Sequence, residues 1–112
     1  MTFSLKEKQV KPAFKLWFEI GDSYVFGDGT YMLLQQIRKK GSISAAAKTT
    51  KMSYRYAWDL IKEVEKHLGE SIIKTQKGGR QGGKSELTRA GLSLLSSYKK
   101  LKKTMTNMCK LE

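Results

Sequence analysis

The segment from Gly41 to Leu68 reads GSISAAAKTTKMSYRYAWDLIKEVEKHL, two helical patterns separated by a break. A first helix is predicted from Ser44 to about Thr50, where three consecutive alanines allow close contact between helices. Lys51-Met52-Ser53 is predicted to form the turn, because the Ser53 hydroxyl is a good N-cap for the next helix. The pattern predicts a helix-turn-helix, whose second helix enters the major groove of DNA.

The second helix, predicted from Tyr54 to Leu68, has a clear 3.6-residue period. Its apolar residues fall on one stripe, formed by Ala57, Leu60, Ile61, Val64 and Leu68. Gly69 follows and is predicted to end the helix, because glycine is favoured just beyond helix ends. The stripe therefore predicts the face that packs on the core.

The opposite face carries the candidate residues for base contact, because a recognition helix contacts bases with its N-terminal residues. These candidates are Ser53, Tyr54, Arg55, Trp58, Asp59 and Lys62. An alternative interpretation makes Tyr54 and Trp58 partly buried core aromatics and Arg55 a solvated charge. The sequence leaves both interpretations open.

Composition supports a small domain that binds a polyanion. The chain has 112 residues, of which 39% are hydrophobic, and 22 Lys and Arg stand against 10 Asp and Glu, a net charge of +12. One small domain can bury a core at this length. So strong a positive charge is typical of nucleic-acid binding, although charge alone does not separate DNA from RNA or an acidic membrane.

The lone cysteine and the absence of long apolar runs suggest the compartment. Cys109 has no cysteine partner, no apolar run approaches the roughly 18 residues of a membrane span, and the N-terminus lacks an apolar signal core. We expect a cytoplasmic, nucleoid-associated prokaryotic protein.

Before the central segment, residues 1 to 12 are polar and basic and are expected to be a flexible arm. Ala13 to Ile20 alternates apolar and polar residues, and Tyr24-Val25-Phe26 follows a turn, so a β-hairpin is predicted. Thr30 to Lys40 reads as a helix that Gly41 ends.

After Gly69, Ser71 to Gln76 and Ser85-Glu86-Leu87 fit two short strands joined by a glycine-rich basic loop. A hairpin of this kind directly after a recognition helix predicts a wing that contacts the phosphate backbone or the minor groove. The loop, Gly78 to Ser85, also matches the G-x-x-x-x-G-K-[ST] string of nucleotide-binding loops. A nucleotide-binding loop leads directly into a helix, whereas a strand and a helix cap are expected after this loop.

The last helix is predicted from Arg89 to about Lys110, with Thr88 as its N-cap. Leucine, tyrosine and methionine side chains alternate spacings of four and three along it, a heptad pattern that favours pairing with another helix. This candidate dimer interface comprises Leu94, Tyr98, Leu101, Met105 and Met108. The alternative is that the seam folds back onto its own domain.

Patterns for catalysis or metal binding are lacking. His67 is the single histidine, Cys109 lies in no CxxC pair, and no two acids are spaced for acid–base chemistry. We expect neither an enzyme nor a metal or cofactor site.

The chain resembles the N-terminal DNA-binding domain of ModE-type, molybdate-responsive regulators, which are related to LysR-type winged helices. The matching text is GSISAAAK, MSYRYAWDLI and KGGRQGGKSELTRAGLSLL. The resemblance implies a winged helix, DNA binding through the second helix and the wing, and a dimer. Regulators of that family bind molybdate in a separate domain, and this chain ends at Glu112. We therefore expect no small-molecule effector.

Taken together, the sequence predicts a mainly α, small-β (α+β) winged helix-turn-helix. Residues 13 to 88 would form the DNA-binding domain, and residues 89 to 112 a dimerisation helix. We expect a homodimeric transcription regulator, acting as a repressor, on double-stranded DNA; the alternatives are a non-specific architectural DNA protein and a protein-binding adaptor. The predicted DNA-binding residues are Ser44, Lys48, Lys51, Ser53, Tyr54, Arg55, Trp58, Asp59, Lys62, Lys77, Arg80, Gln81 and Lys84.

Overall fold

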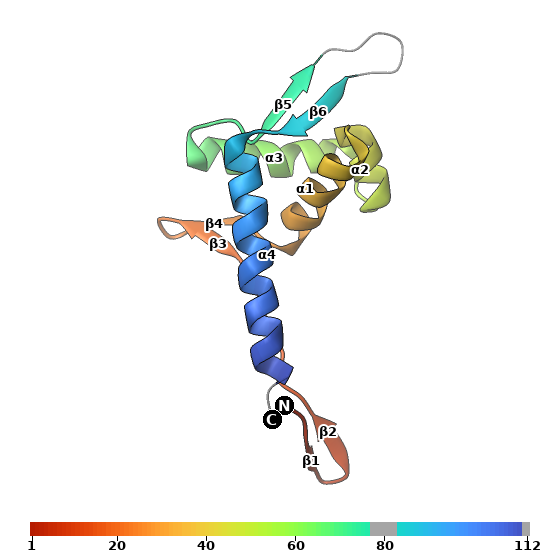
Figure 1. The fold of residues 1–112 in the computed structure, drawn as a ribbon, viewed down its shortest axis with the longest axis vertical. Coiled ribbons are helices and arrows are strands. Elements are labelled where there is room, and N and C mark those ends of the chain that lie inside the picture. The colour runs from red at the N-terminus through yellow and green to blue at the C-terminus, as the bar shows by residue number, and fades with distance from the viewer. Residues whose placement is uncertain (77–82, 111–112) are drawn as a thin grey trace.

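The fold combines four helices with three antiparallel β-hairpins in a computed structural model, which describes residues 1–76 and 83–110 (Figure 1). In chain order the elements are β1 (Phe3–Leu5), β2 (Lys8–Val10), β3 (Phe18–Ile20), β4 (Ser23–Phe26), α1 (Asp28–Lys40), α2 (Ile43–Thr49), α3 (Tyr54–Leu68), β5 (Ile73–Gln76), β6 (Lys84–Leu87) and α4 (Arg89–Lys110). The predicted α+β class is confirmed. Within the described residues, no helix is both long and apolar enough to cross a membrane.

The helix-turn-helix forms at its predicted place. The Ser53 hydroxyl accepts a hydrogen bond from the backbone N–H of Tyr56 at 3.0 Å, so the predicted N-cap of α3 is confirmed. Gly69 ends α3 in the left-handed conformation, with φ 80°. In the turn, Lys51 takes φ 59°, and the next N–H, of Met52, donates to the Ala47 carbonyl at 2.8 Å. These bonds fix the angle between α2 and α3.

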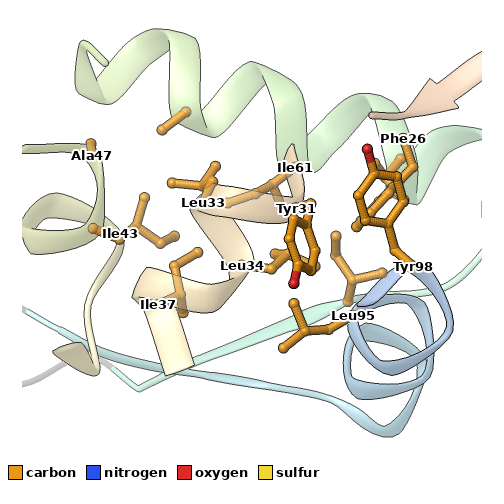
Figure 2. Packing of buried hydrophobic residues seen from close by; sticks show 14 of the residues in the cluster. Phe26, Tyr31, Leu33, Leu34, Ile37, Ile43, Ala47, Ile61, Leu95 and Tyr98 are labelled. Carbon is orange, nitrogen blue, oxygen red and sulfur yellow. The ribbon is translucent and has the colours of Figure 1, made fainter. Parts of the chain in front are cut away.

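Helix α1 lies at the centre of the core, in contact with α2, α3 and α4 (Figure 2). Three of its side chains, Leu33, Leu34 and Ile37, are fully buried. Helix α2 adds Ala46 and Ala47, whose small side chains permit its close approach. The buried part of the predicted α3 stripe is Ala57, Ile61 and Val64, with Leu60 and Leu68 partly buried against it. The outward face of α3 therefore stays free.

The wing is confirmed as an antiparallel hairpin that stands away from the helices (Figure 1). Strands β5 and β6 pair with Lys74 opposite Glu86. The backbone N–H of Ser85 donates to the Gly41 carbonyl at 2.8 Å, which ties β6 to the end of α1. The predicted loop residues 77 to 82 lie outside the described part of the chain.

The N-terminal hairpin is shorter than predicted, and α1 is longer. The expected strand from Ala13 shrinks to β3, and α1 begins at Asp28 rather than Thr30. Since α1 starts directly after Gly27, β4 offers only four residues for pairing. The alternation of apolar and polar residues before β3 still predicts which side chains are partly buried, namely Phe14 and Leu16.

Residues 1 to 12 were expected as a loose arm, and this expectation is wrong for residues 3 to 10. Strands β1 and β2 pair there as a hairpin, with Phe3 opposite Val10. Its turn residues, Lys6 and Glu7, have φ 52° and 64°. Such turns normally use glycine or asparagine, so the sequence carried no signal for this hairpin.

The predicted dimer seam on α4 is wrong in its first half. Tyr98 is fully buried in its own domain, and Leu94 packs partly buried against the same core. The Tyr98 ring lies 5.4 Å from those of Phe18 and Phe26 and 4.6 Å from that of Tyr31, measured between centroids (Figure 2). The first two residues of the heptad pattern, Leu94 and Tyr98, therefore pack within their own domain. The remaining seam residues, Leu101, Met105 and Met108, lie on the outer half of α4.

The Tyr98 hydroxyl joins three distant parts of the chain. It lies 2.9 Å from the Leu16 carbonyl oxygen and hydrogen-bonds the Asp28 carboxylate, which also accepts from Lys102 at 3.0 Å. Burial, followed by the bond to Asp28, raises the pKa of Tyr98 well above its usual value. The Tyr98 hydroxyl and then the Lys102 ammonium lower the pKa of Asp28.

We predict that Tyr98→Phe lowers the free energy of unfolding by about 1–3 kcal/mol at neutral pH, because the Asp28 carboxylate loses the hydrogen bond from the Tyr98 hydroxyl. Since the folded-state pKa of Tyr98 is raised, its contribution is complete below the unfolded pKa of about 10 and decreases above it. Urea unfolding of both proteins near pH 7 and near pH 11 measures the difference. A difference that stays constant between those pH values would contradict this account of Tyr98.

Gly91 allows the first turn of α4 to lie directly on the base of the wing. A Cβ at this position would lie 2.3 Å from the carbonyl oxygen of Ile72, which already accepts from the Thr88 N–H at 3.0 Å. Thr88 is the predicted N-cap, and its hydroxyl accepts from the Gly91 N–H at 3.2 Å. Any side chain here would push α4 away from β5.

We predict that Gly91→Ala destabilises the fold by about 1–3 kcal/mol, the usual cost of overpacking. The matched control is Gly29→Ala in α1, where the nearest atom to a new Cβ is Met52 Cε at 3.8 Å. The control should be neutral or slightly stabilising, because alanine is the better helix former. Thermal unfolding compares the two variants, and equal midpoints would show that the close approach at Gly91 has no structural role.

Candidate nucleic-acid interface

The outward face of α3 is organised into two parallel rows of side chains spaced four residues apart. One row contains Tyr54, Trp58 and Lys62: the two rings stack at 6.5 Å between centroids, and the Lys62 ammonium lies 4.4 Å from the Trp58 centroid. The other row contains Arg55 and Asp59, whose Nε and Oδ1 atoms are 3.4 Å apart. Neighbours at this spacing share one helix face.

These side chains are available to a ligand. The side chain of Arg55 is 86% exposed, and Tyr54 and Trp58 keep 54% and 37% of their surface exposed. Neither aromatic belongs to the buried cluster or packs against it. The core packing that the alternative gave to these two rings is therefore not found, whereas its solvated Arg55 agrees with the exposure of that side chain. Both rings remain candidates for contact with a partner.

The other predicted binding residues surround this face. Those the structure describes are all exposed: Ser44 and Lys48 on α2, Lys51 and Ser53 in the turn, Asp59 and Lys62 on α3, and Lys84 on β6. Lys77, Arg80 and Gln81 lie outside the described residues. The described set thus spans the helix-turn-helix and the base of the wing.

A groove joins the start of α2, the outward face of α3 and the wing. It is lined by Ser42, Ile43, Ser44, Tyr54, Trp58, Thr75, Gly83 and Ser85. Because three elements separated in sequence meet there, the groove is a product of the fold. Its position places wing and aromatic row on one continuous surface.

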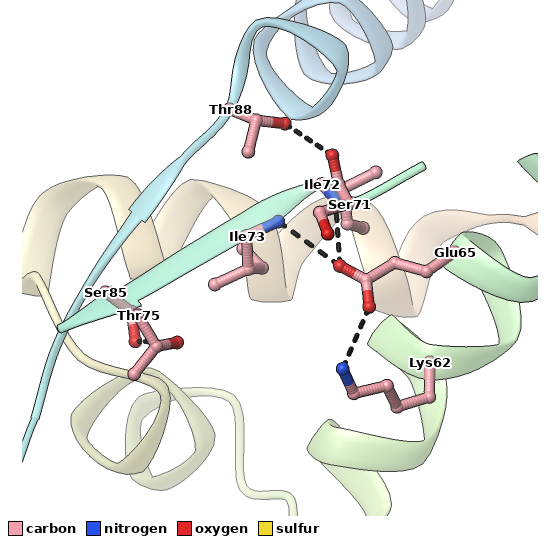
Figure 3. A network of polar contacts seen from close by, with 8 residues as sticks. All are labelled: Lys62, Glu65, Ser71, Ile72, Ile73, Thr75, Ser85 and Thr88. Carbon is pink, nitrogen blue, oxygen red and sulfur yellow. Dashed lines mark hydrogen bonds and ion pairs between the residues drawn. The ribbon is translucent and has the colours of Figure 1, made fainter. Parts of the chain in front are cut away.

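Glu65 links the recognition helix to the wing (Figure 3). Its Oε2 accepts hydrogen bonds from the backbone N–H groups of Ile72 at 2.9 Å and Ile73 at 3.4 Å, and its Oε1 lies 3.1 Å from the Lys62 ammonium. Thr88 completes the junction by donating to the Ser71 carbonyl at 2.7 Å. Sequence reasoning missed Glu65, because an acid on a helix face carries no signal that it will bind backbone amides beyond the helix end.

The charge of this surface is net positive. Its cations are Lys48, Lys51, Arg55 and Lys62, of which Arg55 pairs with Asp59 and Lys62 with Glu65. The Nδ1 atom of His67 lies 3.0 Å from the Glu63 carbonyl oxygen, one turn earlier. Within residues 1–76 and 83–110, no three His, Cys, Asp or Glu side chains gather closely enough to hold a metal ion. This positively charged helix face suits a polyanion that itself has a groove wide enough for a helix.

Several regulatory proteins are similar to part of this chain. It is 38% identical over 74 residues to the molybdenum transport protein ModE of Azotobacter vinelandii, covering 66% of this chain and 27% of the relative. It is 41% identical over 66 residues to the transcriptional regulator ModE of Yersinia pestis, covering 59% and 25%. It is 39% identical over 66 residues to the DNA-binding transcriptional dual regulator ModE of Escherichia coli K12, again covering 59% and 25%. The chain thus spans about a quarter of these relatives, and its resemblance to ModE-type regulators is confirmed.

The family comparison covers the helix-turn-helix, the wing and the start of α4. Residues 30–92 match the model described as the bacterial regulatory helix-turn-helix protein, lysR family. This region contains both rows of α3 and the Glu65 junction. Because the match extends over more than half of the chain, the protein belongs to the LysR family of bacterial regulatory helix-turn-helix proteins.

Proposed function

We propose that this protein is a sequence-specific, double-stranded DNA-binding transcription regulator. The observation that carries the proposal is the exposed double row on α3, which stands beside the wing on one positively charged surface. The B-DNA major groove admits one α-helix, and its base edges are distinguishable there. Membership of a regulatory helix-turn-helix family and the names of the ModE relatives support the same function.

The two parts of the surface would have different tasks. Lys48, Lys51 and Lys84 contact phosphates and supply affinity that decreases with salt, because bound lysines release counterions from DNA. The predicted loop cations Lys77 and Arg80 would act in the same way. The residues of the two rows on α3 would contact base edges, and Arg55 would donate two hydrogen bonds to guanine. The Glu65 junction holds the two parts in register.

We also infer that the protein is a homodimer, paired through the outer half of α4. Leu101 and Met108 are 46% and 62% exposed there, and Met105 lies between them. The helix has 22 residues and a length of about 33 Å, so its outer turns extend beyond the core they would otherwise cover. Pairing of two such ends buries these side chains and presents two recognition helices to a two-fold symmetric site. Repression by occupation of a promoter is the simplest outcome of such binding.

We predict that Arg55→Ala lowers affinity for a site selected from a random DNA pool by about 1–3 kcal/mol and leaves affinity for random duplex nearly unchanged. Lys84→Ala should weaken both and reduce the salt slope by about one. Lys103→Ala, on the exposed outer part of α4, is the matched control for loss of one positive charge. Fluorescence anisotropy at several salt concentrations gives all values. Failure of the pool to yield any preferred sequence would support a non-specific architectural protein instead.

We predict that wild-type protein sediments as a dimer at micromolar concentration and that the double variant Leu101→Glu, Met108→Glu sediments as a monomer. Charges in an apolar interface are costly when unpaired. Met32→Glu is the control, because Met32 is 49% exposed on α1, away from the proposed interface. Sedimentation velocity measures the three proteins. A monomeric wild type, or a double variant that remains dimeric, would rule out this interface.

A further inference from the structure

The aromatic pair on α3 is unusual for a surface built to attract phosphate. Tyr54 and Trp58 are stacked with an interplanar angle of 17°, and both are exposed in the middle of a cationic face. Hydrogen-bond donors suffice for backbone contact, so phosphate binding does not account for two large apolar rings. The rings must meet an apolar part of the partner.

The arrangement around Trp58 restricts how that contact is made. Tyr54 flanks its ring from the preceding turn, and the Lys62 ammonium lies over it from the following turn. Lys62 is itself held at 3.1 Å by Glu65, which is anchored to the Ile72 N–H. The Lys62 ammonium occupies one face of the Trp58 ring, and Tyr54 lies beside the ring with a lateral offset. This crowding favours contact with a compact apolar group over full stacking on a nucleobase, and 37% of the Trp58 surface remains exposed for it.

The surface of α3 beside Trp58 has an apolar side, formed by the two rings, and a polar side, formed by Arg55 and Asp59. A shallow groove runs between the two rows of α3, lined by Tyr54, Arg55, Trp58 and Asp59. In the major groove, the apolar group that a base presents is the C5 methyl of thymine, and apolar side chains contact it. The hydrogen-bonding edges of the neighbouring base then face the Arg55 side.

We propose that Tyr54 and Trp58 form a thymine-methyl sensor: the ring edges and the Arg55 stem enclose the C5 methyl of one thymine in each half-site. The sensor makes thymine obligatory at one position, beside the base that Arg55 contacts. This inference rests on the proposed function, because it applies once α3 lies in the major groove. It names the chemical group by which the surface would distinguish thymine from other bases.

The test replaces single thymines of a selected duplex by deoxyuridine, which removes the methyl group and keeps every hydrogen-bonding atom. The full-length chain should lose affinity about fourfold at one thymine per half-site, as expected for one buried methyl group, and nothing at the others. Trp58→Gln and Tyr54→Ser should bring the thymine-to-uracil ratio at that position close to one. Tyr56→Ser is the matched control, because Tyr56 is 55% exposed on the same helix but stands off the row, and it should keep the full ratio.

The possible results distinguish failure of the methyl contact from failure of sequence-specific DNA binding. A protein that selects a preferred site, yet binds every uracil-substituted version equally well, lacks the sensor but remains sequence-specific. An unchanged thymine-to-uracil ratio in the Trp58→Gln variant would also overturn the sensor, because the methyl contact would then come from another residue. If no preferred site is selected at all, sequence-specific binding itself is wrong.

Discussion

Burial of one stripe of α3 against α1 is the constraint on which the rest of the molecule depends. Ala57, Ile61 and Val64 are almost completely removed from solvent, and a helix has only one face to bury in this way. Their burial fixes the rotation of α3 about its own axis. The two rows on the opposite face therefore point outward, and the Glu65 side chain is brought to the first residues of the wing. Rotation of α3 by one residue would lose the core contact and misplace both.

The second constraint is the rigid junction between α3 and the wing. A carboxylate that accepts two successive amide N–H groups is a charge-assisted contact, stronger than a bond between neutral groups. Gly91 and Thr88 place the start of α4 on Ser71 and Ile72, the residues just before β5. Helix, wing and α4 thus form one unit, in which the phosphate contacts proposed for the wing and the base contacts proposed for α3 would keep a fixed separation. Such preorganisation reduces the entropy that binding must overcome.

Local chemistry predicted much of this architecture, and distant contacts explain what it missed. Ser53 and Gly69 act within one turn of their own position, so the bounds of α3 could be predicted from sequence. Tyr98 fits a heptad equally well whether it faces a second chain or its own core, and only the ring cluster with Phe18, Phe26 and Tyr31 decides between them. The turn at Lys6 and Glu7 uses residues without a turn signal. Of the candidate interface, the exposed residues were predictable, whereas their division into rows and their link through Glu65 required the fold.

Amide chemical-shift mapping shows whether DNA binds to the outward rows of α3 together with the wing. A ¹⁵N-labelled full-length chain is titrated with a duplex selected from a random pool. We expect the largest shift changes between residues 44 and 62 and in β5 and β6, with the outer half of α4 little affected. Largest changes in the β1–β2 hairpin or on α4, with α3 unchanged, would contradict it.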